Sequence, residues 1–243
     1  MAFEVRREKM PSADTIFALS SAPGMAGVAV IRISGPAAAS AAGLFGIGRL
    51  EPRHARLARI SSPATGEPID QCLAIRFPGP NSFTGEDVLE LHVHGGRAVI
   101  AATLDALSQM PGLRLAEAGE FTRRAFHNGK LDLTEAEGLA ALLAAETEVQ
   151  RRQALQIANG ALRDIYEAWR HDLIGAMSLI EAALDFSDEG DVADTATAQA
   201  RQQVAGLRSQ IGTHLNDGRR GEILRDASRL YWPDRQMPVN PAC

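Results

Sequence analysis

The spacing of apolar residues along the chain changes near residue 119. Before that point, short alternating or β-branched runs predict strands, and apolar residues at helical spacing predict helices at 36–45 and 97–110. Strands and helices mingle here without a strict βαβ alternation, so residues 14–119 predict an α+β domain with a mixed sheet. The predicted strands lie at 15–19, 27–34, 55–61, 71–77, 87–94 and 113–116.

Helical periodicity alone continues after residue 119. Residues 120–127 predict a short helix that ends at Asn128-Gly129, because this pair readily adopts the left-handed conformation past a helix end. Thr134 and Glu137 form a capping-box pattern, which predicts the start of a further helix.

Two long apolar stripes follow. Apolar residues from Leu155 to Leu184 predict a helix of about 35 residues, and those from Val204 to Leu215 predict its partner. Because long amphipathic helices bury such stripes against other helices, residues 120–226 predict an all-α region, either a helical bundle or part of one.

The two ends of the chain carry no such periodicity. Residues 1–13 are polar and mixed in charge, which predicts a flexible extension. Residues 227–243 are rich in proline and hold Tyr231 and Trp232, which predicts an unstructured tail of different composition from the rest.

Composition narrows the class of protein. The 243 residues are 45% hydrophobic and 23% charged, as in soluble globular proteins. The two cysteines exclude a disulfide framework and a zinc site made of cysteines alone. A net charge of -5 argues against binding nucleic acid through bulk charge, and the absence of a signal peptide or a run of about 20 apolar residues predicts a cytoplasmic chain without membrane contact.

Polar residues inside two apolar strands are the clearest candidates for function. Glu90, His92 and His94 alternate with apolar residues and therefore share one strand face, and Arg32 occupies a similar place in its own strand. Arg32 and Glu90 either pair with each other or face a polar ligand, since a lone buried charge is costly. The two histidines lack a third ligand at a typical spacing, so no metal site is predicted; lining a pocket or a dimer contact is the alternative.

Nucleotide-binding motifs are absent. Gly129-Lys130 is followed by leucine and has no glycine five residues before Gly129, so it is not a phosphate-binding loop. The acidic cluster that follows the first apolar stripe predicts a solvated linker rather than a cation site; it comprises Asp185, Asp188, Glu189, Asp191 and Asp194. No catalytic residue is predicted.

Four segments occur in the order found in one known family. They are DTIFALSSAPGMAGVAVIRISG at 14–35, FPGPNSFTGEDVLELHVHGG at 77–96, PGLRLAEAGEFTRRAFHNGKLDLTEAEGLAALLAAET at 111–147 and LDFSDE at 184–189. In these segments the chain resembles the MnmE (TrmE) family of tRNA-modification GTPases, over residues 14 to 226.

The resemblance implies a fold and a function. The family's N-terminal domain is similar to the aminomethyltransferase domain of glycine cleavage, binds 5-formyltetrahydrofolate or a related one-carbon folate, and forms the homodimer. A helical domain follows, into which a Ras-like G domain is inserted. With a flavin-dependent partner protein, the family adds a carboxymethylaminomethyl group to carbon 5 of the wobble uridine of certain tRNAs.

The resemblance also assigns site residues. The family's folate-contacting arginine, glutamate and lysine fall on Arg32, Glu90 and Lys130. A carboxylate accepts paired hydrogen bonds from a pterin ring, whereas Arg and Lys suit the ligand's carboxylates. Three further residues of the same motif are expected to shape the site or the dimer contact: Asn81, Phe83 and Thr84.

The chain departs from the family after residue 226. It continues ASRLYWPDRQMPVNPAC, without counterparts of the G domain, the later helices or the C-terminal cysteine motif, so we expect a truncated product. GTP, Mg²⁺ and K⁺ are therefore expected only in the full-length family, and this chain is expected to be inactive as a GTPase. The alternatives are an aminomethyltransferase-like folate enzyme and a non-catalytic dimerisation module.

Overall fold

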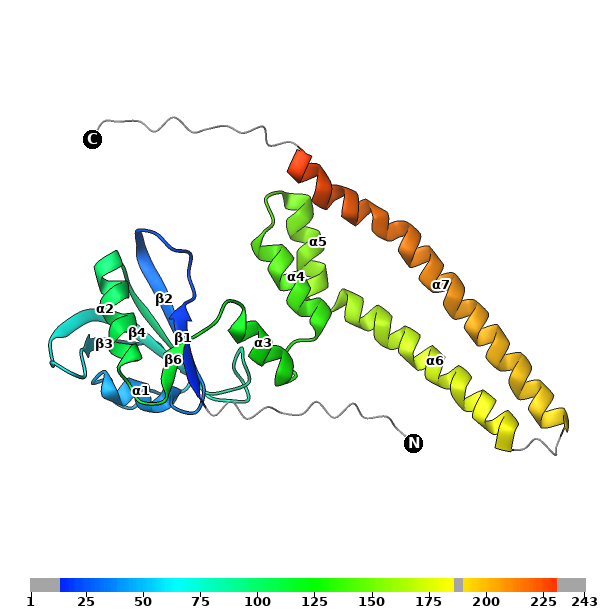
Figure 1. Cartoon of the computed structure of the whole chain (residues 1–243), viewed down its shortest axis with the longest axis horizontal. Helices are drawn as coiled ribbons and strands as arrows, with labels where there is room; N and C mark the ends of the chain where they lie inside the picture. The colour runs from blue at the N-terminus through cyan, green and yellow to red at the C-terminus, as the bar shows by residue number, and fades with distance from the viewer. Residues whose placement is uncertain (1–13, 186–189, 231–243) are drawn as a thin grey trace. The chain divides into compact units, whose positions relative to one another are not determined.

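The chain forms two compact units that divide between Leu133 and Thr134 (Figure 1). The structure, a computed structural model, describes residues 14–185 and 190–230. The extension predicted at 1–13 and most of the tail predicted at 227–243 lie outside the described residues. The division falls later than the boundary predicted at 119/120, because the helix that follows residue 119 is tied to the first unit by ion pairs described below.

Unit 1, residues 14–133, combines six strands with three helices. Each strand and helix predicted from the sequence is present, with ends shifted by at most three residues. The strands are β1 (Thr15–Leu19), β2 (Ala26–Ser34), β3 (Arg56–Ser61), β4 (Pro68–Phe77), β5 (Val88–Gly95) and β6 (Leu113–Leu115). The helices are α1 (Ala38–Leu44), α2 (Arg97–Ser108) and α3 (Glu120–His127).

The strands form one mixed sheet in the order β3-β4-β5-β2-β1-β6. Only β1 and β6 pair in parallel; the other neighbours are antiparallel. The predicted α+β fold with a mixed sheet is therefore confirmed. The central β2–β5 pair has Arg32 opposite Glu90 and Ile31 opposite Leu91, so charged and apolar pairs alternate between the two faces.

The apolar face of this sheet packs against α1 and α2. Its core contains fully buried side chains from the central strands, such as Ile31, Ile33 and Leu91, together with small residues of α1 and Leu107 of α2. Arg32 and Glu90 lie on the opposite face, which α1 and α2 leave uncovered. The α3 helix ends as predicted, at Asn128 followed by Gly129 with a φ of 68°.

Unit 2 contains only helices among the residues described. They are α4 (Leu133–Leu143), whose first residue belongs to unit 1, α5 (Glu148–Ala158), α6 (Ala161–Asp185) and α7 (Gly190–Leu230). Because α7 continues to Leu230, it enters the region predicted as a tail by four residues, and residues 231–243 lie outside the described part.

Two predictions for these helices were wrong in detail. The predicted helix of about 35 residues is instead α5 and α6, separated at Asn159-Gly160, where Gly160 has a φ of 90° that no continuing helix accommodates. The predicted capping box at Thr134 does not open α4, because the helix already begins at Leu133. The capping box observed is that of Thr147 and Gln150 at the start of α5.

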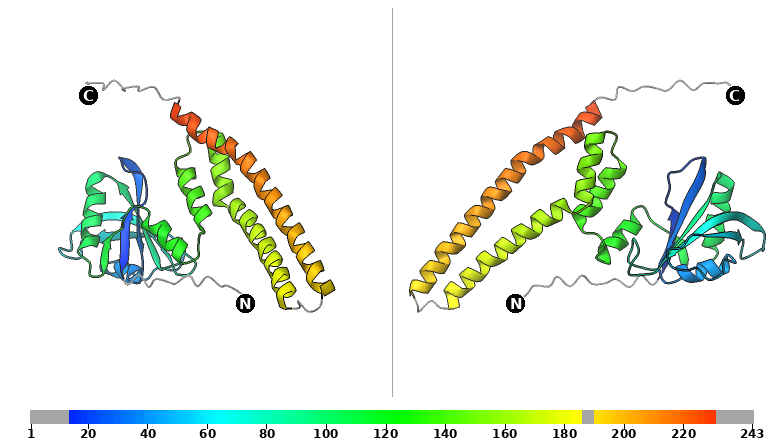
Figure 2. Two further views of the ribbon diagram at one scale, coloured as in Figure 1. Left: turned by 45° about the vertical axis from the view of Figure 1, so that its right-hand side comes forward. Right: turned by 180° about the vertical axis from the view of Figure 1, so that it is seen from behind.

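The helices α6 and α7 run side by side in opposite directions (Figures 1 and 2). In α4 and α5 the backbones approach closely where Gly138 meets Ile157 and Ala158. No helix within residues 14–185 and 190–230 has both the length and the apolar composition that a membrane span requires.

Candidate functional site

The Arg32–Glu90 pair is the centre of the candidate site in unit 1. Arg32 Nε donates a hydrogen bond of 2.9 Å to Glu90 Oε1, and Nη2 lies 2.8 Å from the same oxygen. The side chains are only 23% and 15% exposed, so the pair is partly shielded from water. Of the two predicted alternatives, direct pairing is observed, and it leaves Glu90 Oε2 and Arg32 Nη1 outside the pair.

His92 extends this polar group, whereas His94 does not. His92 Nε2 lies 3.4 Å from Glu90 Oε2. His94 bonds Asp70 instead, with its ring Nδ1 at 2.7 Å and its backbone N–H at 2.8 Å. Burial raises the pKa of Asp70, but these bonds outweigh it and hold that pKa below the ordinary value. Among the described residues, no three His, Cys, Asp or Glu side chains converge as metal ligands.

Two aromatic rings flank the Arg32 guanidinium. Its Cζ lies 5.0 Å from the centre of the Phe83 ring and 5.6 Å from that of Phe121. Phe83 belongs to the segment between β4 and β5, and Phe121 belongs to α3. Sequence reasoning named Phe83 but missed Phe121, although Phe121 lies in one of the four family-like segments.

A cluster of five ionised side chains holds α3 against the sheet; we call it the Arg124 cluster. Arg124 bonds the backbone oxygen of Asp14 at 3.1 Å and its carboxylate at 2.9 Å, Glu86 at 3.2 Å and Glu120 at 3.1 Å. Arg114 bonds Glu120 at 2.6 and 2.8 Å and also pairs with Asp14. The Arg124 and Glu120 side chains are only 8% and 3% exposed, so the cluster is anchored in a buried position.

The pKa values within the cluster follow from its geometry. Hydrogen bonds from Arg114, opposed by burial and aided by the Glu117 N–H and by Arg124, lower the pKa of Glu120 to about 2. A hydrogen bond from Arg114 likewise holds the pKa of Asp14 below its ordinary value. Both carboxylates are therefore ionised at neutral pH.

The segment between β4 and β5 is fixed at several points. The Thr84 hydroxyl is buried and lies 2.7 Å from that of Ser34, which also donates to Glu86 at 2.7 Å. The Thr84 carbonyl accepts a 2.7 Å bond from Asn128, just past α3. The carbonyl of Asn81 accepts a bond from Arg53. Thr84 therefore fixes the segment to β2 and to the end of α3, while Phe83 lies next to the Arg32 guanidinium.

Lys130 lies beside the same segment, and none of the hydrogen bonds or ion pairs found in the described part of the chain joins it to Arg32 or Glu90. Its backbone N–H bonds Ala125 at 2.8 Å, closing the turn after α3. A Cβ at Gly85, whose φ is 77°, would come within 3.2 Å of the Lys130 Cγ. The structure thus brings Arg32 and Glu90 together and places exposed Lys130 at the neighbouring turn. Gly129-Lys130 forms this helix-terminal turn.

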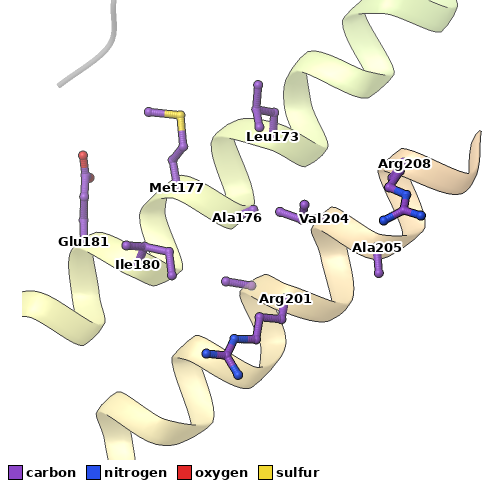
Figure 3. A pocket seen from close by; sticks show the side chains of 10 residues that line it. Leu173, Ala176, Met177, Ile180, Glu181, Arg201, Val204, Ala205 and Arg208 are labelled. Carbon is purple, nitrogen blue, oxygen red and sulfur yellow. The ribbon is translucent and has the colours of Figure 1, made fainter. Parts of the chain in front are cut away.

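Unit 2 contains a different kind of concavity. A groove of about 540 Å³ runs between α6 and α7 and is lined mainly by apolar side chains, among them Leu173, Met177, Ile180 and Val204 (Figure 3). Three charged residues, Glu181, Arg201 and Arg208, also line the groove. The groove is separate from the Arg32–Glu90 pair, which belongs to unit 1. This lining is typical of a helix-packing surface rather than of a site that orients a polar ligand.

The predicted acidic linker is described only in part. Asp185 is the last residue of α6, and Asp191 and Asp194 lie in the first turns of α7. Asp188 and Glu189 lie outside the described residues.

Comparisons with known proteins place each unit. The family model described as "GTP-binding protein TrmE N-terminus" matches residues 15–130, and that described as "MnmE helical domain" matches residues 133–229. A tRNA modification GTPase MnmE from Parvibaculum lavamentivorans is 57% identical over 214 residues, which are 88% of this chain and 49% of that protein.

Two further relatives agree with this result. A human mitochondrial protein named as a subunit of 5-taurinomethyluridine-tRNA synthase is 52% identical over 88% of this chain and 44% of its own length. A tRNA modification GTPase MnmE from Azorhizobium caulinodans is 54% identical over 88% of this chain and 49% of its own. The chain therefore spans about half the length of the curated relatives it matches.

Proposed function

The chain belongs to the MnmE (TrmE) family, and from this premise we propose that it is the folate-binding and helical part of a tRNA-modification GTPase. Its ligand is a one-carbon tetrahydrofolate such as 5-formyltetrahydrofolate, and its binding residues are Arg32, Glu90 and Lys130. The observation that carries the proposal is the Arg32–Glu90 pair on the face of the sheet that α1 and α2 leave uncovered.

The chemistry of the pair suits a flat heterocycle. An ionised carboxylate has about four acceptor positions, and Arg32 uses only one of the two Glu90 oxygens. A ring that presents an N–H beside an amino group forms two parallel hydrogen bonds with such a carboxylate. The ammonium of Lys130, exposed at the next turn, suits the carboxylates at the other end of a folate.

Calorimetry with 5-formyltetrahydrofolate tests this assignment. The wild-type chain is expected to bind, and Glu90→Gln is expected to weaken binding at least about tenfold, because a charged acceptor is replaced by a neutral amide. Glu51→Gln, which removes an exposed carboxylate of the same unit, is the control and is expected to bind like wild type. Equal affinities for wild type and Glu90→Gln would remove Glu90 from the site.

We further propose that unit 1 forms a homodimer. Leu57 and Leu73 are opposite each other on β3 and β4, are 61% and 42% exposed, and share a face with His92. An apolar pair beside the candidate site is suited to contact with a second copy. Light scattering is expected to show a dimer for wild type and a monomer for Leu73→Asp, with Leu143→Asp in unit 2 as the control. A monomeric wild type at micromolar concentration would contradict the dimer.

On the same premise, we propose that this chain takes part in a tRNA modification. In that reaction, the whole protein and a flavin-dependent partner add a carboxymethylaminomethyl group to carbon 5 of a wobble uridine. The chain alone is expected to give no GTP turnover, since its sequence contains no phosphate-binding loop. A chimera tests this proposal. In it, this chain replaces the N-terminal and first helical segments of a full-length relative, and the chimera is expected to modify tRNA. A folded, GTP-binding chimera that leaves the uridine unmodified would contradict the proposal.

A further inference from the structure

The guanidinium of Arg32 is held by Glu90 and by two aromatic rings, although its side chain is partly exposed. Its Nε and Nη2 both engage one oxygen of Glu90, while Nη1 has no hydrogen-bond partner among the described residues. The guanidinium also lies within 6 Å of two ring centres, the distance at which a cation is attracted to an aromatic face. One edge of the guanidinium is thus used, and Nη1 is left to donate to a ligand.

The two rings come from segments that have no sheet hydrogen bonds of their own to hold them. Phe121 lies in the first turn of α3, a helix of eight residues that is too short to be stable alone. Phe83 lies in the segment that joins β4 to β5. Their positions next to Arg32 must therefore come from tertiary contacts.

The Arg124 cluster supplies these contacts to both segments at once. Arg124 belongs to α3 and bonds Glu86, three residues after Phe83, as well as Asp14 at the start of β1. Ser34, two residues after Arg32 on β2, donates to the same Glu86 and lies against Thr84. One buried arginine therefore ties α3, the Phe83 segment and the start of β1 together.

We propose that Phe83 and Phe121, held by the Arg124 cluster, are positioning residues that fix the Arg32 guanidinium so that its Nη1 faces the ligand. This inference rests on the proposed folate site. The rings contact Arg32 and act through it, so their removal frees a long side chain to sample other rotamers, and binding must then order it again.

A double-mutant cycle tests the contact without any ligand. Phe121→Leu, Arg32→Met and the double variant are compared with wild type by denaturant unfolding, followed through hydrogen exchange of the sheet amides. The expected result is coupling: Phe121→Leu destabilises unit 1 less when Arg32 is already methionine. The Arg32 Nε–H resonance is expected to shift in Phe121→Leu, since a neighbouring ring is removed. Additive effects and an unmoved resonance would overturn the proposal.

Ligand affinity provides the second arm. With 5-formyltetrahydrofolate, Phe121→Leu is expected to bind about tenfold more weakly than wild type, whereas Phe121→Tyr, which keeps the ring, is expected to bind within about threefold. Phe126→Leu makes the same change on the same helix, where the ring contacts His127, and is the matched control. Wild-type affinity in Phe121→Leu, or an equal loss in Phe126→Leu, would refute the positioning role.

The unfolding cycle and the folate titration together distinguish failure of the positioning role from failure of the proposed folate site. If wild type binds no folate, the proposed function fails, and the unfolding cycle and the resonance still decide whether the rings hold Arg32. If Phe121→Leu does not fold, Phe83→Leu removes the other ring and is expected to give the same coupling with Arg32→Met. Absence of coupling in that variant would likewise overturn the proposal.

Discussion

In unit 1 the largest side chains are fully buried in one core, whereas in unit 2 the buried side chains are mostly alanines. Phe17, Phe45, Ile31 and Leu91 are at most 1% exposed. Among the described residues of unit 2, several large apolar side chains of α6 and α7 are between 41% and 71% exposed, including Leu173, Met177, Ile180 and Leu184, although Leu207 is buried. The sheet of unit 1 is therefore stabilised by its own core, while α6 and α7 bury mainly small residues against each other.

The ion pairs of the two units differ in the same way. In unit 1, Arg124 joins Asp14, which is 110 residues away in the sequence, to residues of its own helix. In unit 2 most pairs join positions one turn apart, as in Arg151 with Glu148 and Arg170 with Glu167. A long-range buried pair stabilises tertiary structure, whereas a local exposed pair adds little even to its own helix. The ion pairs of unit 1 are thus better able to hold the side chains of a binding site in fixed positions than those of unit 2.

The largest expected effect comes from breaking the long-range pair. Arg124→Met should destabilise unit 1 by about 4 kcal/mol, because three carboxylates lose a buried cation. Amide hydrogen exchange of the sheet measures this change. Fluorescence from Trp169 should stay unchanged, since this residue belongs to α6 in unit 2. Arg151→Met is the control and should leave both signals as in wild type. Equal effects of the two substitutions would contradict the difference between the long-range pairs of unit 1 and the local pairs of unit 2.

Truncating one leucine in each unit compares their packing. Leu91→Ala in unit 1 should cost about 3 kcal/mol, because a fully buried side chain leaves a cavity in the core. Leu173→Ala, at a position 47% exposed on α6, should cost less than about 1 kcal/mol. Denaturant unfolding followed by circular dichroism and by tryptophan fluorescence gives both values. A larger loss at Leu173 would show that α6 is covered in solution by a partner or by further chain.

Acid should weaken unit 1 through Glu120. The folded-state pKa of Glu120, about 2, lies below its ordinary value of 4.5, so its stabilisation is complete above pH 4.5 and is lost as the pH falls toward 2. The contribution at stake is at most roughly 3 kcal/mol. Unfolding free energies measured between pH 6 and 2.5 should show this slope in wild type. Glu120→Gln should flatten it; an unchanged slope would assign the acid sensitivity to other carboxylates.

Two glycines test packing within unit 2. Gly138→Ala should destabilise the α4–α5 contact by about 2 kcal/mol, because the new Cβ would come within 2.4 Å of the Ala158 nitrogen. Gly206→Ala, on α7 with nothing within 4 Å, should stabilise that helix by about 1 kcal/mol. Thermal unfolding followed by circular dichroism at 222 nm measures both. Opposite signs would support tight packing at α4–α5 and open space at Gly206.

Local periodicity was sufficient to predict every strand and helix of unit 1 and to single out Arg32 and Glu90 as charged positions inside apolar strands. A charged residue inside an apolar strand is a strong signal, because burying it alone is costly. The same reasoning failed at the α5–α6 junction, where apolar spacing continues across Gly160 and hides the break. The break depends on Gly160, which has a φ of 90°, and the start of α5 on the Thr147–Gln150 capping box; neither changes the spacing of the apolar residues.

The site was predictable only in part. Its folate-binding role for Arg32, Glu90 and Lys130 rests on the resemblance and stays a prediction. The Arg32–Glu90 contact was one of two alternatives until the β2–β5 register placed them opposite each other. Phe121 and the Arg124 cluster were missed, because no pattern within α3 indicates which distant carboxylates its arginine meets.

The sequence by itself determined the local conformations, the change from a mixed sheet to helices and the family, since these depend on short-range spacing and on motifs. Only the tertiary structure decided that α3 belongs with the sheet, that Arg124 meets Asp14 and Glu86, and that two phenylalanines flank Arg32. These contacts join residues 38 to 110 positions apart, or strands whose register sets which side chains meet. Chain periodicity contains no information about them, because they depend on how whole elements pack.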